Sequence, residues 1–163
     1  MALSRVGSDP LTGDGAGLLI QLPDEFYRSA CPPAGINLPP DGEYGVGMVF
    51  LPTIEKERVY CQRQFTRIIK QAGLKLLGWR DVPVNNAVIG KTAREKEPVI
   101  KNIFIQRPAD LTAELAFERK LYLIRKQVET AIRCSSLTQQ DYFYIPSLSA
   151  RTVNYKGQLM SSQ

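Results

Sequence analysis

No histidine occurs among the 163 residues of this sequence, and its absence excludes several kinds of catalytic site. A Ser-His-Asp triad needs an imidazole as its general base, and most zinc sites include a histidine ligand. Cysteine is scarce as well. Cys31, Cys61 and Cys134 are separated by 30 and 73 residues, so no Cys-x-x-Cys pair offers a local clamp for zinc or an iron-sulfur cluster. We expect three structural thiols that pack as small apolar groups, and no metal ligands.

Long apolar stretches are also missing. No run reaches the roughly 18 residues that a membrane-spanning helix needs, and the first residues lack the charged and then apolar layout of a secretory signal. Hydrophobic residues make up 44% of the chain and charged residues 23%, as in ordinary globular proteins. The sequence therefore predicts one globular domain without a membrane partner, located in the cytoplasm or in a plastid stroma.

Positive charge exceeds negative charge, with 21 Lys and Arg against 16 Asp and Glu and a net charge of +5. Clustered basic residues would indicate a nucleic-acid site. Here acidic residues alternate with basic ones, as in segments 55–58 and 94–97, and no recognition motif accompanies them. We interpret these segments as solvated surface and expect no nucleic-acid partner. Nonspecific binding to DNA or RNA remains an alternative that rests on charge alone.

The most distinctive segment is 9–17, Asp-Pro-Leu-Thr-Gly-Asp-Gly-Ala-Gly, which leads directly into the apolar run 18–20. Three glycines and two aspartates in nine residues suit a tight turn whose backbone approaches another group closely. A functional loop beside a pocket and a plain turn that orients the next strand both fit this composition, and the plain turn is the commoner use of such residues.

Apolar periodicity predicts the secondary structure. Proline residues make 31–42 a loop, because proline fixes φ and supplies no backbone donor. A short helix is expected at 24–28, with longer helices between Thr53 and Gly73 and from Asp110 to about Arg133. Strands are expected at 17–22, 44–50, 74–79, 99–105, 142–145 and 151–155, the last two joined through Pro146 and a serine-rich turn.

Two of the expected strands have unusual faces. Gly45 and Gly47 share one face of strand 44–50, which either leaves that face flat for a neighbouring layer or marks a bulge. Strand 99–105 is apolar on both faces, which indicates a strand covered on two sides. The connection from strand through helix to strand over 44–79 fits either a parallel or an antiparallel arrangement.

The two long helices show apolar stripes at helical spacing. Thr53 and Asp110 are the expected N-caps, and Glu129 is expected to pair with Arg133. The stripes predict that both helices cover a sheet, although the second stripe also fits an interface with a partner helix. Their members are Phe65, Ile68, Ile69 and Ala72 in the first helix and Phe117, Leu121, Ile124, Val128 and Ile132 in the second.

Several carboxylates and one arginine are candidates for chemistry, but each has a plainer interpretation. Asp9, Asp14 and Asp81 share no repeated spacing, so turns explain them better than a carboxylate site does. Arg80 beside Asp81 fits either a bidentate clamp for a substrate carboxylate or a structural ion pair, and we favour the ion pair.

Two serines and a lysine near the end of the chain complete the candidates. Ser147, Ser149 and Lys156 lack the Ser-x-x-Lys spacing of a serine acylase. The sequence therefore predicts no catalytic, cofactor-binding or metal-binding residue in this chain.

Four segments follow one another in a recognisable order. They are 9–17, 78–85 (Gly-Trp-Arg-Asp-Val-Pro-Val-Asn), 117–122 (Phe-Glu-Arg-Lys-Leu-Tyr) and 144–152 (Tyr-Ile-Pro-Ser-Leu-Ser-Ala-Arg-Thr). In this order they resemble the class-II glutamine amidotransferase domain that opens the large subunit of glutamate synthase, over about residues 7–163. The resemblance implies an α+β fold of the N-terminal nucleophile type, an α-β-β-α sandwich that is incomplete here, with 1–163 as one partial domain.

The catalytic groups of that family have no match in this chain. The resemblance implies a nucleophilic cysteine as the first residue of the mature enzyme, with its own amino group as the base, yet no cysteine precedes Cys31. The family's His-Ser-Arg-Phe motif and its oxyanion-hole Asn-Gly pair lie downstream of the element matched by Tyr155-Lys156-Gly157, and this sequence contains neither histidine nor Asn-Gly. We therefore expect an interior portion of the domain, one that is inactive alone.

The resemblance also implies the reaction of the whole enzyme. Glutamine releases ammonia, which passes through an internal tunnel and combines with 2-oxoglutarate to form glutamate. The flavin mononucleotide and iron-sulfur cluster of that reaction belong to later domains, so none is expected in this segment. The implied partners are the remaining domains of the large subunit, with glutamine as the family's substrate. A stand-alone, non-catalytic interaction or regulatory domain on the same scaffold is the alternative.

Overall fold

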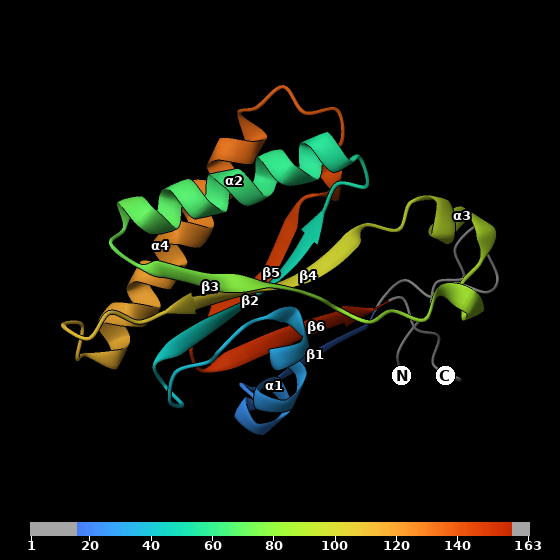
Figure 1. Ribbon diagram of the computed structural model, residues 1–163. Helices are drawn as coiled ribbons and strands as arrows, with labels where there is room; N and C mark the ends of the chain where they lie inside the picture. Colours follow the sequence, from blue (N-terminus) through green and yellow to red (C-terminus); the bar gives the residue numbers. More distant parts are fainter. Residues whose placement is uncertain (1–15, 158–163) are drawn as a thin grey trace, which may run out of the picture.

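The computed structural model describes residues 16–157, in which helices and antiparallel strands are mixed, as expected for the α+β class (Figure 1). The strands in this range are β1 (Ala16–Gln21), β2 (Tyr44–Leu51), β3 (Lys75–Asp81), β4 (Val99–Gln106), β5 (Tyr144–Ser149) and β6 (Thr152–Gly157). The α-helices are α1 (Asp24–Ala30), α2 (Glu55–Gln71), α3 (Lys91–Glu95) and α4 (Glu114–Arg133). Short 3₁₀ helices occur at Pro32–Ala34, Asn86–Val88 and Gln140–Tyr142.

The strands form two antiparallel sheets. Four of them pair in the order β3-β4-β2-β5, and β1 pairs with β6 in a separate two-stranded sheet. Because β2 and β3 are each antiparallel to β4, they run parallel to each other with β4 between them. The connection β2-α2-β3 is therefore a crossover between parallel strands, which resolves the alternative that the sequence left open.

The sheets and helices are layered. The helices α2 and α4 cover one face of the four-stranded sheet, while α1 and the β1–β6 sheet lie on its other side (Figure 1). The predicted stripes of both long helices point into the larger core, where every member except the half-buried Ala72 is buried. Strand β4 is covered on both sides as expected, because Ile103 and Ile105 enter this core while Phe104 packs with Tyr27 and Tyr44 in a smaller one.

The glycines of β2 serve close packing. A side chain at Gly45 would place its Cβ 2.6 Å from Leu121 Cδ1 of α4, and one at Gly47 would lie 2.5 Å from Ile103 Cγ2 of β4. The flat face of the strand thus admits a neighbouring layer, as predicted. The pairing of β2 with β5 also shifts register between Met48 and Phe50, so the strand is irregular there, as the bulge alternative expected.

The predicted N-cap of α2 is wrong. The helix begins at Glu55, with Ile54 in the cap position and no side-chain cap from its own segment. The Ile54 N–H donates to Oε1 of Gln139 at 3.0 Å, and the Thr53 hydroxyl also bonds the Gln139 amide. Gln139, 85 positions away in the sequence, thus provides the hydrogen-bond acceptor that a residue next to the helix start would otherwise provide.

The start of α4 and its predicted ion pair are also corrected. Ala113 occupies the cap position instead of Asp110, because the preceding turn is tied by the Arg107 guanidinium, which donates to the backbone carbonyls of the loop. Glu129 accepts a hydrogen bond from Arg125 at 2.8 Å, one turn towards the helix start, and makes no ion pair with Arg133.

Pro146 lies inside β5, where the sequence had placed it in a turn between two strands. Within residues 16–157, strand β5 is an edge strand that pairs only with β2, and this pairing is irregular beside Pro146. The missing N–H therefore interrupts no regular ladder, which is the setting in which a strand tolerates proline. The predicted loop 31–42 is confirmed, apart from the 3₁₀ helix Pro32–Ala34.

Candidate functional site

Glu118 of α4 holds the turn between β5 and β6. Its carboxylate accepts hydrogen bonds from the Ser149 hydroxyl at 3.0 Å and from the Ala150 N–H at 2.5 Å. The Ser149 oxygen in turn accepts two backbone N–H groups of the same turn. This turn carries the chain from the four-stranded sheet to the two-stranded one. A side chain of segment 117–122 therefore fixes the geometry of segment 144–152.

The other serine and the lysine of this region also have structural partners. The Ser147 oxygen accepts the N–H of Asn154 at 3.0 Å, which joins β5 to β6 between the sheets. Lys156 lies over Gly17 of β1, where an added Cβ would come within 3.3 Å of the lysine side chain. Both serine hydroxyls thus accept hydrogen bonds from backbone N–H groups and hold the backbone in position.

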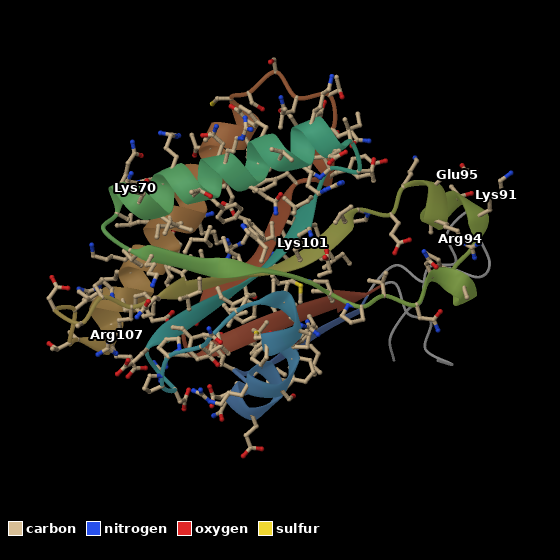
Figure 2. The ribbon with its side chains drawn as sticks, viewed as in Figure 1. Lys70, Lys91, Arg94, Glu95, Lys101 and Arg107 are labelled. Carbon is tan, nitrogen blue, oxygen red and sulfur yellow. The ribbon has the colours of Figure 1, made fainter. Side chains whose placement is uncertain are left out.

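Arg80 and Asp81 point away from each other, as adjacent residues of a strand do. Asp81 forms a 2.6 Å ion pair with Lys101 of β4, whose position Figure 2 shows. Arg80 donates to Oδ1 of Asn102 at 3.2 Å and lies 5.3 Å from the centre of the Phe26 ring. The ion pair expected for Arg80 is therefore wrong, because Arg80 makes none within residues 16–157. Asp81, expected in a turn, ends β3 and pairs with Lys101 instead.

Asn102 and Glu118 are polar residues that the sequence did not single out. Asn102 is fully buried in β4, and its amide nitrogen lies within hydrogen-bonding reach of the Gly47 carbonyl at 3.5 Å. An isolated amide in the middle of a strand that is apolar on both faces was the available signal, because a buried amide needs partners. Glu118 offered no comparable signal, since its partners are 31 and 32 residues away.

Two tyrosines connect α1 to the sheets. The hydroxyls of Tyr27 and Tyr155 share a hydrogen bond at 2.9 Å, and burial, followed by this bond, raises the pKa of Tyr27 above its usual range. Tyr44 donates to Asp24 at 2.7 Å. Burial would raise the pKa of Asp24, but hydrogen bonds from Arg28 and Tyr44 outweigh it and hold that pKa below its ordinary value. Burial, followed by the hydrogen bond to Asp24, likewise raises the pKa of Tyr44. The Tyr27 and Tyr44 hydroxyls therefore stay protonated, and Tyr44 is a fixed donor to Asp24.

The cysteines differ in exposure. Cys31 and Cys61 are buried, as expected for structural thiols, whereas Cys134 is exposed at the end of α4. Burial raises the pKa of Cys31, and burial together with the charge of Glu57 raises the pKa of Cys61 to about 12. Such thiols carry little thiolate at neutral pH and are poor nucleophiles.

Some expectations fall on parts of the chain without a structural description. Asp9, Asp14 and most of the glycine-rich segment lie outside residues 16–157. Within the described part, no three His, Cys, Asp or Glu side chains form a group that could hold a metal ion. None of the helices there has the length and apolar character needed to cross a membrane.

Comparison with known proteins shows which family this chain is similar to. The family model for class-II glutamine amidotransferases matches residues 4–163. The large chain of NADPH glutamate synthase from Bacillus subtilis is 48% identical over 96% of this chain, and a chloroplastic ferredoxin-dependent glutamate synthase from Arabidopsis thaliana is 36% identical over 95%. The chain spans only 10% and 9% of these relatives.

Among solved structures, the C-terminal domain of the MgtC protein from Mycobacterium tuberculosis aligns over 77% of this chain and all of that domain. Its TM-score of 0.33 and identity of 15% are too low to inform the fold. The family model covers nearly the whole sequence and several glutamate synthases agree with it. This chain therefore belongs to the class-II glutamine amidotransferase family.

Proposed function

We propose that this chain is part of the ammonia-donating glutaminase domain of a glutamate synthase large chain. The observation that carries the proposal is the match to the family model over residues 4–163, together with relatives that bear the name glutamate synthase. The contact of Glu118 with the β5–β6 turn adds support, because two of the four segments that resemble the family brace each other there.

The role we propose for these residues is to shape the domain. The order of helices, four-stranded sheet and β1–β6 sheet is consistent with an incomplete α-β-β-α sandwich of the N-terminal nucleophile type. In such a domain a cysteine thiolate attacks the side-chain amide of glutamine, and oxyanion-hole donors stabilise the tetrahedral intermediate. We propose that Glu118, Ser147 and Ser149 fix the spacing of the two sheets between which such a site is built.

We further propose that the 163-residue chain does not hydrolyse glutamine by itself. It has no cysteine before Cys31, no histidine and no Asn-Gly pair. The buried thiols Cys31 and Cys61 have raised pKa values, so neither is a ready substitute for the missing nucleophile.

The remaining expectations follow from membership of a larger enzyme. We propose the other domains of the large chain as partners, glutamine as the substrate of the complete domain, and flavin mononucleotide and an iron-sulfur cluster as cofactors of those other domains. The cytoplasm or a plastid stroma is the proposed location. The relatives carry names with NADPH, ferredoxin and NADH, so family membership leaves the electron donor open.

A segment exchange tests the proposal. Residues 4–163 replace the corresponding segment of the Bacillus subtilis large chain, and glutamate formation from 2-oxoglutarate is measured with glutamine or with free ammonia. We expect the hybrid enzyme to use glutamine, and the 163-residue chain alone to release no ammonia from it. The ammonia-dependent reaction is the control for an intact synthase site. A hybrid that uses free ammonia but not glutamine would contradict the proposal, as would ammonia release by the chain alone.

The second candidate is a stand-alone interaction domain on the same scaffold. It is favoured by one observation, a groove lined by residues of α2 and α4. The groove could serve a partner whether or not the chain contributes to catalysis.

A further inference from the structure

A groove of about 430 Å³ is lined by residues of α2 and α4. Figure 1 shows these two helices on the same side of the four-stranded sheet. Leu123, whose side chain is 54% exposed, and the half-buried Ala131 give it apolar surface, and the buried Ile68 lies at its base. Arg67 and Lys126 stand on opposite helices at its edge. The groove therefore combines an apolar lining with a positively charged rim.

Basic side chains continue along the outward face of both helices. Arg119, Lys126 and Arg133 of α4 follow one another at intervals of seven residues, or about two helical turns, so they share one face. On α2, Lys56, Arg63 and Lys70 have the same seven-residue spacing, and Arg67 lies one turn after Arg63. Figure 2 shows Lys70 on α2. The basic rim, as we name this set, consists of the exposed residues Lys56, Arg63, Arg67, Lys70, Arg119, Lys126 and Arg133.

Most of the basic rim lacks acidic partners. Within residues 16–157, only Lys126 of the seven has a carboxylate within ion-pair distance, that of Glu129. The Arg67 guanidinium bonds only the amide oxygens of Gln64 and Gln71. Unpaired cations on one face create a positive potential that attracts a negatively charged partner.

We propose that the groove between α2 and α4 binds an acidic amphipathic helix of a partner protein. Apolar residues of that helix at positions i, i+3, i+4 and i+7 would fill the groove beside Leu123, and its carboxylates would face the basic rim. The apolar lining favours this partner over a nucleic acid, whose phosphates would use the rim but leave the exposed Leu123 without a counterpart. This inference stands independently of the proposed glutaminase role.

Fluorescence anisotropy with a labelled helical peptide tests the inference. The peptide carries leucine at i, i+3, i+4 and i+7 and glutamate elsewhere, and it is titrated with the 163-residue chain. A peptide with the same composition in scrambled order is the control for charge alone. We expect the ordered peptide to bind more tightly, with an affinity that falls as salt is added.

Two variants of the chain locate the binding surface. Leu123→Asp, and Arg67→Glu combined with Lys126→Glu, are each expected to weaken binding by at least about tenfold. Their matched controls are Leu115→Asp, a leucine of α4 with 60% exposure outside the groove, and Lys91→Glu combined with Lys96→Glu on the α3 segment. The controls are expected to change affinity by less than about twofold. Circular dichroism checks that every variant is folded.

Several results would overturn the inference. Equal affinity for the ordered and scrambled peptides, equal loss in the groove and control variants, or the absence of binding would each do so. Tighter binding of an oligonucleotide that depends on Arg67 and Lys126 but not on Leu123 would assign the surface to nucleic acid instead.

Discussion

Glu118 holds the β5–β6 turn, so its loss should destabilise the fold. In Glu118→Ala, the Ala150 N–H and the Ser149 hydroxyl lose their acceptor at a partly buried turn. Leaving such donors unsatisfied costs about 1–3 kcal/mol, and we expect the free energy of unfolding to fall by that amount in urea titrations. Glu118→Gln keeps one acceptor oxygen, so its free energy of unfolding should lie between those of the wild-type chain and Glu118→Ala.

Glu114 provides a matched control on the same helix. It pairs with Arg151 of the same turn at 3.2 Å, but both side chains are about 60% exposed. Exposed ion pairs contribute about 0–1 kcal/mol, so Glu114→Ala should change stability little. Equal losses in Glu114→Ala and Glu118→Ala would show that the turn is not held by Glu118.

The cysteines should respond very differently to alkylation and to pH. Iodoacetamide is expected to label exposed Cys134 in the folded chain and to leave Cys61 unmodified until the chain unfolds, as read by mass spectrometry.

Because burial raises the pKa of Cys61 from 9.0 to about 12, the folded state holds this proton more tightly than the unfolded state does. The free energy of unfolding should therefore fall as pH rises above 9, and less so in Cys61→Ala. Rapid labelling of Cys61 in the folded chain would contradict the burial on which both cysteine predictions rest.

Burial at single positions was easier to predict than hydrogen-bond partners. The stripe from Phe117 to Ile132 was predicted from spacing alone, because helical periodicity is a local property. The caps were not, since Ile54 finds its acceptor on Gln139, which is distant in the sequence. Local patterns say that a donor needs a partner, but they do not say which long-range residue provides it.

The packing of α4 on β2 depends on Gly45. In Gly45→Val, the Cβ alone would lie 2.6 Å from Leu121 Cδ1, so the helix and strand must separate or Leu121 must leave its position. Overpacking of this kind costs about 1–3 kcal/mol, which thermal or urea unfolding can measure. Adding Leu121→Ala should make the Gly45→Val change less costly than it is in the wild-type background. Additive losses in this double-mutant cycle would show that the two residues do not interfere.

Strand β5 shows what element-level patterns leave out. Its sequence contains Pro146, which the rules of strand composition place at an end or in a turn. Whether a strand is central or at an edge depends on its neighbours in the sheet, and in the described part of the chain β5 has only β2 as a neighbour. The same holds for β2 and β3, whose parallel arrangement is set by β4, a strand that follows them both in the chain.

The arrangement of the whole molecule rests on pairings between distant segments. β1 pairs with β6 across nearly the full described chain, with Ala16 opposite Gly157, and no local pattern carries that information. Strand and helix patterns and the family resemblance both predicted a layered α+β fold, but neither predicted which strands pair. The glycine-rich segment and its role remain a prediction, because residues 9–15 lie outside the described part of the chain.

The isolated chain should associate through its two-stranded sheet. Strands β1 and β6 pair only with each other within residues 16–157, and a two-stranded sheet is marginally stable in water. Leu18 and Leu19 of β1 are 60% and 65% exposed, so an unpaired strand edge lies beside apolar side chains. Light scattering after size exclusion should show association that increases with concentration.

Leu18→Lys combined with Leu19→Lys should raise the monomer fraction, because charged residues on an edge strand oppose further pairing. Leu115→Lys, at 60% exposure on α4, is the control and should leave association unchanged. A wild-type chain that stays monomeric at high concentration and melts cooperatively would show that these edges need no partner.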